Sequence, residues 1–266
     1  MTSRFVEVNN ANIYYEMEGE GTPLILNHAG IADGRMWNDQ FDVFAEQYQT
    51  IRYDKRGFGK TKMVAGDYSD HNDLYELMKA LNIENAIQVG CSQGAKTIID
   101  FTLEHPELTK ALVLVTPAIS GFVYDGPPPK QIDQLIQADE DGDLDLINEL
   151  ELQIWVDGPQ RTPDQVDSKV RELVRDMNLI ALQTPDDLGN ELPLEPPAID
   201  RLSEIIVPTL IIAGDLDAPP SLTRADILAE KISHAKRVTI NSTAHLPNME
   251  KPELFNEKVL SFLSKI

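Results

Sequence analysis

The feature that most constrains this chain is the stretch Gly90-Cys91-Ser92-Gln93-Gly94, which has the pattern Gly-x-Ser-x-Gly. An apolar run at residues 86–89 precedes it, and a run with helical spacing at residues 95–103 follows it. A tight turn between a strand and a helix holds a serine hydroxyl away from the backbone, and glycines on either side keep the turn uncrowded. The stretch therefore predicts that Ser92 is a nucleophile displayed on such a turn.

Strand-like and helical segments alternate over residues 1–119, and the alternation resumes over residues 201–266. This alternation predicts an α/β fold, with a mostly parallel sheet and helices on both of its faces. The predicted strands are 5–8, 11–17, 23–27, 50–53, 86–89, 111–115, 209–213 and 237–240. The predicted helices are 38–47, 69–81, 95–103, 221–232 and 252–263, with Ser69 as a candidate N-cap of the second.

Residues 120–200 interrupt this alternation. The segment holds the triplet Pro127-Pro128-Pro129, three helical patterns at 130–138, 143–156 and 164–182, and a second proline-rich stretch at 193–197. We interpret residues 120–200 as a helical cap inserted between the two parts of the core, 1–119 and 201–266.

A serine hydroxyl needs a neighbouring base to take its proton, and histidine has a suitable pKa. His245 follows the predicted strand 237–240, and in an open α/β sheet ligands gather at the carboxyl ends of the strands. We therefore expect His245 to be the base. Structural roles suit the other four histidines better; they are His28, His71, His105 and His234.

The base in turn needs a carboxylate that orients it. Asp215 and Asp217 both follow the predicted strand 209–213, in the chain order serine, aspartate, histidine. The glycine turn before them places the first aspartate at the strand edge and the second further round. We assign the role to Asp217, with Asp215 as the alternative in a turn-forming or solvated position.

Attack on a carbonyl creates an oxyanion, which needs backbone N–H donors already in place. Gln93 supplies one, because its N–H lies just after the nucleophile and near the start of a helix. Gly30, in the loop after strand 23–27, is the candidate for the other. We expect His28 to brace this loop rather than take part in chemistry.

Composition narrows the class of partner. The net charge of −21 disfavours nucleic acid and anionic membranes, which are bound through clustered Lys and Arg. The N-terminus has no apolar core of signal-peptide length, and no apolar run approaches the roughly 18 residues of a membrane span. Cys91 is the single cysteine, so no intramolecular disulfide can form. We expect a cytoplasmic monomer or homodimer that acts on a small molecule.

No metal or phosphate motif accompanies these residues. The chain has no His-Glu-x-x-His, no paired cysteines and no calcium-loop spacing, and Gly57-Phe58-Gly59 lacks the further glycine of a phosphate loop. We expect neither a metal nor another cofactor.

Together these motifs resemble the α/β-hydrolase-fold superfamily along nearly the whole chain. The matching motifs are His28-Ala29-Gly30, residues 53–59, residues 90–94, Gly214-Asp215-Leu216-Asp217 and Ala244-His245. The resemblance implies Ser92 as nucleophile, Asp217 as acid, His245 as base, Gly30 and Gln93 as oxyanion donors, and residues 120–200 as cap. It also implies mainly structural roles for Asp54 and Arg56. Ala29 departs from the pattern, because glycine is commoner there. Cys91 is expected to be a small buried filler.

A serine nucleophile sets the chain apart from the branch of this superfamily that uses aspartate, the haloalkane dehalogenases and epoxide hydrolases. It implies an acyl-enzyme route, as in esterases, lactonases or C–C bond hydrolases. Residues 244–252 also resemble those of 3-oxoadipate enol-lactonases.

The charge of the predicted cap indicates the charge of the substrate. Residues 120–200 hold 19 Asp and Glu against 5 Lys and Arg, and no anion clamp is evident. We therefore expect a small, neutral, partly apolar carboxylic ester, with Phe122, Leu152 and Trp155 as candidate lining. The alternatives are a lactonase, a C–C bond hydrolase, or a small-molecule receptor without catalysis.

Overall fold

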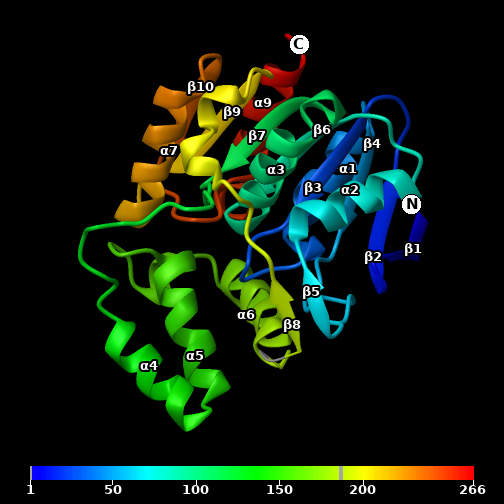
Figure 1. Cartoon of the computed structure of the whole chain (residues 1–266). Coiled ribbons are helices and arrows are strands. Elements are labelled where there is room, and N and C mark those ends of the chain that lie inside the picture. The colour runs from blue at the N-terminus through cyan, green and yellow to red at the C-terminus, as the bar shows by residue number, and fades with distance from the viewer. Residues whose placement is uncertain (1, 186–187) are drawn as a thin grey trace.

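The computed structural model describes residues 2–185 and 188–266, and a large central sheet organises them (Figure 1). Its eight strands are β1 (Thr2–Val8), β2 (Ala11–Glu18), β3 (Pro23–Asn27), β4 (Gln49–Tyr53), β6 (Ala86–Cys91), β7 (Thr109–Val115), β9 (Thr209–Gly214) and β10 (Ala235–Ile240). Across the sheet their order is β1-β2-β4-β3-β6-β7-β9-β10. The pairs β1–β2 and β2–β4 are antiparallel, and the others are parallel.

Helices cover both faces of the sheet because the strands are apolar on both sides. In β3, Ile25 packs into one buried cluster, whereas Leu24 and Leu26 pack into the other. The first cluster includes side chains of α2 (Asp70–Ala80), α3 (Gln93–Glu104) and α7 (Pro219–Lys231). The second includes α1 (Asn38–Ala45) and α9 (Pro252–Leu263). The predicted α/β class, with a mostly parallel sheet between two layers of helices, is confirmed.

Every predicted strand and helix of the core is present, with its ends shifted by a few residues. Two short strands and one short α-helix were not predicted. The strands β5 (Gly66–Tyr68) and β8 (Gly189–Glu191) pair in parallel with each other, and α8 (Pro247–Glu250) follows the His245 loop. Ser69 occupies the N-cap position of α2, as predicted, but its side chain makes no capping hydrogen bond.

Between β7 and β9 the chain forms a helical layer beside the core (Figure 1). It comprises α4 (Ile132–Asp141), α5 (Leu144–Glu151), a π-helical turn (Leu152–Asp157) and α6 (Ser168–Leu182). We call these the cap helices. Buried side chains of the π-helical turn and α6, such as Val156 and Met177, join the same apolar cluster as Trp37 of the core. The cap helices are therefore packed onto the core, and residues 120 and 200 stay our proposed boundaries.

Candidate active site

Ser92 lies on the sharp turn that the sequence predicts. Strand β6 ends at Cys91, helix α3 begins at Gln93, and Ser92 between them has φ 52° and ψ −113°. A positive φ is strained for a residue with a side chain, and such strain concentrates at functional sites. A Cβ at Gly94 would lie 2.2 Å from the carbonyl oxygen of Asn27, and one at Gly90 would lie 2.4 Å from that of Gly94. Both glycines are therefore sterically required.

His245 and Asp217 form a buried pair. The Nδ1 atom of His245 lies 2.9 Å from Oδ2 of Asp217, and both residues are 2% exposed. The other carboxylate oxygen of Asp217 accepts the backbone N–H of Ala218 at 2.7 Å. His245 comes from the loop after β10 and Asp217 from the loop after β9, so the two residues come from neighbouring strand ends.

Asp215 does not contact the histidine ring in any hydrogen bond of the described residues. Its Oδ1 accepts the backbone N–H of Ser242 at 2.5 Å. The contact ties the loop after β9 to the loop after β10, which is a turn-forming role. Of the two aspartates that the sequence offered, Asp217 is the one beside His245.

A cavity of about 300 Å³ brings most of the predicted site together. Its lining comprises Gly30, Ile31, Phe58, Ser92, Gln93, Trp155 and His245. We call it the Ser92 cavity. Four core residues of the sequence prediction and one cap residue, Trp155, therefore meet in one place. The Trp155 indole lies against the His245 ring, with 4.8 Å between their centroids.

Two predicted lining residues lie elsewhere. Leu152 is 1% exposed and packs into the apolar cluster between cap and core. Phe122 packs at the edge of the other cluster, with the Arg224 guanidinium 5.5 Å from its ring centroid. Neither belongs to the lining of the Ser92 cavity, because each side chain is taken up by packing against the core.

His28 braces the loop that carries Gly30. Its Nε2 accepts the backbone N–H of Lys55 at 2.9 Å, and its Nδ1 lies 2.8 Å from the carbonyl oxygen of Ala29. These contacts suit a neutral ring that donates from Nδ1 and accepts at Nε2. Complete burial and, next, the charge of Lys55 lower the pKa of His28 to about 3. The ring is therefore an uncharged structural link at neutral pH.

A buried ion pair that sequence reasoning missed lies against Gln93. The Lys55 ammonium donates to Oε1 of Gln93 at 2.7 Å and to Oδ2 of Asp70 at 3.1 Å. Burial lowers the pKa of Lys55, while Asp70 opposes that shift. The Gln93 Oε1 atom also lies 3.0 Å from where a Cβ on Gly30 would be. Lys55 thus holds the Gln93 side chain, which lies beside Gly30.

A second ion pair, which the sequence analysis did not predict, joins the cap to the loop that carries His245. The Arg161 guanidinium pairs with Glu250 at 2.6 Å, and the other carboxylate oxygen of Glu250 accepts the backbone N–H of Ala244 at 2.7 Å. Arg161 also donates to the carbonyl oxygens of Val156 and Asp157 at 2.8 Å each. The end of the π-helical turn is thereby fixed to the residue before His245.

The motif residues outside the cavity have structural contacts. Asp54 accepts the backbone N–H groups of Gly34 and Lys60, each at 2.8 Å. Arg56 pairs with Asp73 at 2.5 Å. Cys91 is fully buried beside Thr116, and burial raises the pKa of its thiol to about 12, so it is not a reactive thiolate.

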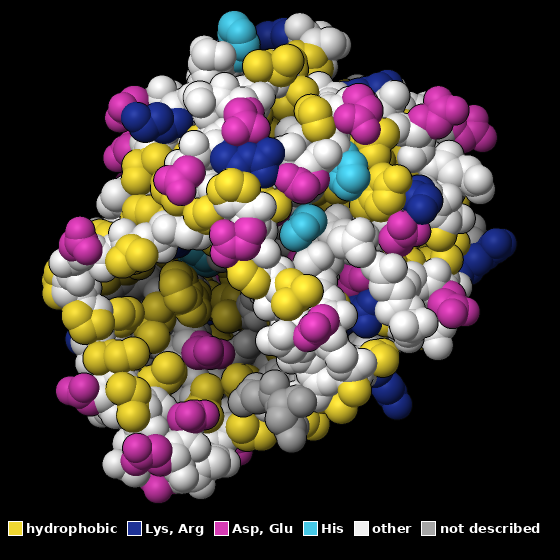
Figure 2. Space-filling view, viewed as in Figure 1, with side chains coloured by type: hydrophobic (Ala, Val, Ile, Leu, Met, Phe, Trp, Pro, Cys, Tyr) yellow, Lys and Arg dark blue, Asp and Glu magenta, His cyan; other side chains and the backbone are white. Residues whose placement is uncertain are grey.

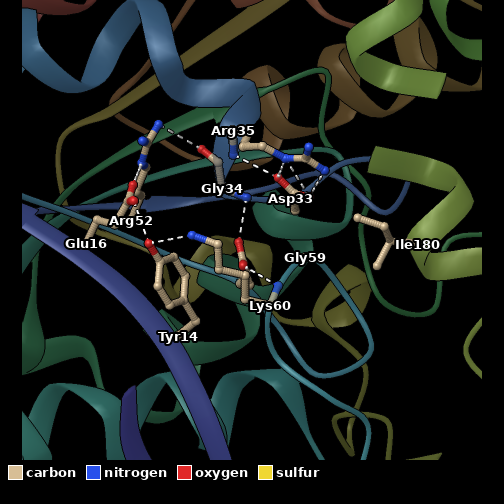
Figure 3. A pocket seen from close by; sticks show the side chains of 10 residues that line it. Tyr14, Glu16, Asp33, Gly34, Arg35, Arg52, Gly59, Lys60 and Ile180 are labelled. Carbon is tan, nitrogen blue, oxygen red and sulfur yellow. Dashed lines mark hydrogen bonds and ion pairs between the residues drawn. The ribbon is translucent and has the colours of Figure 1, made fainter. Parts of the chain in front are cut away.

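A polar cavity of about 190 Å³ on the core shares no lining residue with the Ser92 cavity (Figure 3). Both arginines that line it are paired with carboxylates. Arg35 pairs with Asp33 at 2.7 Å, and Arg52 pairs with Glu16 at 2.5 Å. Lys60 also lines it, and its ammonium donates to the Tyr14 hydroxyl at 2.9 Å. Because neither Ser92 nor a histidine lines this cavity, we do not consider it a candidate active site.

Within residues 2–185 and 188–266, no three His, Cys, Asp or Glu side chains gather as a metal site would need. In the same residues, no helix combines the length and apolarity needed to cross a membrane.

The fold is that of an α/β hydrolase. A model of the alpha/beta hydrolase fold family matches residues 22–252, so the chain belongs to that family.

The relatives of this chain include a hydrolase and an enol-lactonase. The chain is 28% identical to 2-hydroxy-6-oxo-6-(2'-aminophenyl)hexa-2,4-dienoic acid hydrolase of Metapseudomonas resinovorans, over 98% of this chain and 91% of the relative. It is 25% identical to 3-oxoadipate enol-lactonase 1 of Acinetobacter baylyi, over 93% and 91%. The solved structure of Est816, an N-acyl homoserine lactone degrading enzyme, matches with a TM-score of 0.78 at 25% identity, covering 97% of this chain and 99% of that one. The resemblance stated from the motifs is confirmed.

Proposed function

We propose that the protein is a serine hydrolase that cleaves small carboxylic esters through an acyl-enzyme intermediate. The observation that carries this proposal is the arrangement at the Ser92 cavity. A serine on a strained turn and a histidine line the same cavity, and the far nitrogen of that histidine is bonded to a buried aspartate.

In the first half of the reaction, Ser92 Oγ attacks the ester carbonyl and His245 takes its proton. Because Nδ1 of His245 is bonded to Asp217, the free ring nitrogen is Nε2, and this is the atom that accepts the proton. The carboxylate of Asp217 stabilises the imidazolium that results. The carbonyl oxygen becomes an oxyanion, which the backbone N–H groups of Gln93 and Gly30 stabilise.

The tetrahedral intermediate then collapses. The imidazolium of His245 gives its proton to the oxygen of the leaving alcohol, and the acyl group remains on Ser92. In the second half, His245 takes a proton from water, the hydroxide attacks the acyl carbon, and the proton returns to Ser92 Oγ. The products are one alcohol and one carboxylic acid, and no cofactor is consumed.

The lining favours a neutral substrate with apolar parts. Ile31, Phe58 and Trp155 supply apolar walls to the Ser92 cavity. Lys55, a buried cation beside Gln93, already bonds to Asp70 and Gln93. It is therefore not a free partner for a substrate carboxylate.

Lactone and C–C bond hydrolysis are the alternatives, since the same nucleophile and base serve them. One relative is named as an enol-lactonase, and another as the hydrolase of a 2-hydroxy-6-oxo-hexadienoic acid. A receptor that binds without turnover is the third. The substrate panel below separates these alternatives.

The test is hydrolysis of p-nitrophenyl acetate and butyrate, together with a simple lactone, by the native protein and by Ser92→Ala. We expect native turnover and its loss in Ser92→Ala, with the fold unchanged by circular dichroism. Ser264→Ala, at an exposed serine near the C-terminus, is the matched control and should remain active. Retention of ester cleavage by Ser92→Ala would refute the nucleophile assignment. Tight ligand binding without turnover would favour the receptor.

The strongly acidic chain and its single cysteine support a cytoplasmic setting and a small-molecule partner. The monomer or homodimer state stays a prediction.

A further inference from the structure

A second cavity lies beyond Trp155 as seen from Ser92. Its volume is about 260 Å³, and six of its lining residues are prolines, namely Pro127, Pro128, Pro129, Pro159, Pro219 and Pro220. We call it the proline cavity. On the face where the cap helices meet the core, Figure 2 shows a hollow whose walls are mostly hydrophobic.

The proline cavity is apolar although the surrounding segment is acidic. None of the described residues that line it is Asp or Glu, whereas residues 120–200 hold 19 of them. The polar residues of the lining are Lys130, Gln131 and Gln153, and Lys130 is exposed, so its ammonium can stay in solvent. Tyr124 and Ile154 add further apolar surface to its walls. Proline rings are rigid, so a cavity that they line is held open without ordering flexible side chains. The chemistry of the lining therefore suits a neutral, apolar group.

Trp155 separates this cavity from the catalytic one. It is the residue common to the two linings among the described residues. On one side its indole lies 4.8 Å from the His245 ring. On the other side the proline cavity reaches Ala218, the residue next to Asp217.

The backbone that carries Trp155 is firmly held. Leu152 and Val156, on either side of it in the π-helical turn, are buried against the core. Asp157 is bonded to Arg171 at 2.8 Å, and Arg161 fixes the same turn to the His245 loop. π-Helical turns are rare and recur at functional sites. The position of Trp155 between the two cavities is therefore fixed by its neighbours in the turn.

The position of the cavity indicates which half of an ester it receives. In the proposed mechanism the leaving alcohol takes its proton from His245, so the alcohol oxygen lies beside the imidazole. The acyl oxygen lies on the opposite side, at Gly30 and Gln93. A chain that extends from the alcohol oxygen past the imidazole therefore meets the Trp155 indole and then the proline cavity.

We propose that the proline cavity binds the apolar end of the alcohol group, and that Trp155 limits how long that group can be. The inference rests on the proposed ester hydrolysis. The ligand class is an unbranched or aromatic neutral alcohol of medium length. The acyl half of the substrate does not contact this cavity.

The experiment uses two isomeric esters, hexyl acetate and ethyl hexanoate, which have the same atoms but differ in which half is long. Acid release is followed for the native protein, Trp155→Ala and Trp155→Phe. Because a buried methylene changes binding by about fourfold, we expect Trp155→Ala to raise the ratio of kcat/KM for hexyl acetate over ethyl hexanoate by about tenfold or more. Trp155→Phe should move the ratio less, in the same direction. Leu146→Ala, at an exposed position of the cap, is the matched control.

A variant that reduces the volume of the proline cavity tests the same inference, because the substituted residue lies on another wall of that cavity. Gln153 lines the proline cavity but not the Ser92 cavity, so Gln153→Trp should lower the ratio. An unchanged ratio in both variants, or a rise in activity on ethyl hexanoate instead, would overturn the inference while leaving ester hydrolysis intact. Binding of 1-hexanol to Ser92→Ala, with and without Trp155→Ala, gives a readout that needs no turnover. Equal affinity in the two proteins would also contradict it.

Discussion

The pH dependence of the free energy of unfolding tests whether a neutral His28 supports the loop that carries Gly30. The native state holds this ring neutral, with its pKa lowered from 6.5 to about 3 by burial, whereas the unfolded chain protonates it near pH 6.5. Its stabilising contribution is therefore complete above pH 6.5 and is lost as the pH falls below that value, because the unfolded state binds the proton first. Between about pH 7.5 and pH 5, this group alone lowers the free energy of unfolding by about 2 kcal/mol.

Other buried groups contribute with the opposite sign. Burial raises the pKa values of Asp54 and Asp100, so their carboxyls are protonated in the native state first and stabilise it as the pH falls. The difference between the native protein and His28→Gln isolates the histidine, because the carboxyl contributions cancel. A glutamine can still accept the Lys55 N–H through its amide oxygen, but it does not titrate.

The assay is urea denaturation of both proteins at each pH. The native protein should be the more stable at pH 7.5, and its advantage should shrink by about 2 kcal/mol at pH 5. His234→Gln, at an exposed histidine, is the matched control, and its stability should run parallel to that of the native protein. If the advantage over His28→Gln stays constant with pH, His28 is not held neutral and the proposed brace is wrong.

Three further predictions concern the site itself. Asp217→Asn should lower kcat by about 10³-fold to 10⁴-fold with little loss of stability, because the carboxylate that orients the histidine is removed; steady-state kinetics on p-nitrophenyl butyrate check this, and a loss under tenfold would contradict it. Lys55→Met should lower kcat by about tenfold and change KM by less than about twofold, because Gln93 loses its anchor; Lys55→Arg should restore part of the loss, and a raised KM with an unchanged kcat would point to substrate binding instead. Gly94→Ala should destabilise the fold by about 3 kcal/mol or more, since its Cβ would meet a backbone oxygen at 2.2 Å; an unchanged urea midpoint would show that the turn can relax.

The parts of the site that sequence reasoning predicted are those with local signals. The turn around Ser92 could be predicted because Gly90 and Gly94 are adjacent to it, and the structure shows both closely approached by backbone. Asp217 and His245 could be predicted from chain order and from the strands that precede them. The strands themselves carry apolar runs, so their positions were predicted to within a few residues.

The contacts that were missed join segments far apart in the chain. Lys55, Asp70 and Gln93 belong to three different elements, and no spacing rule connects them. The bond between Arg161 and Glu250 spans 89 positions. The strands β5 and β8 have three residues each and no apolar pattern, so propensity could not reveal them. Such pairings follow from the tertiary fold.

In the cap, the sequence could not predict the directions in which side chains point. Leu152 and Trp155 are three apart, which places them on one face of an α-helix, and both were expected to line the substrate site. The turn that carries them is π-helical, and its i→i+5 bonding changes the facing of successive residues. Leu152 is buried against the core, whereas Trp155 reaches the Ser92 cavity. The apolar character of the two residues could be known from sequence, but their directions could not.

The central claim is that Ser92 is a nucleophile activated by His245 and Asp217. Its most direct test is the site and rate of labelling by a fluorophosphonate, mapped by peptide mass spectrometry. We predict a single phosphonylated residue, Ser92, in the native protein, with no labelling of Ser92→Ala and labelling slowed by at least about 10²-fold in Asp217→Asn. Labelling at another residue, or equal rates in the native protein and Asp217→Asn, would contradict the account.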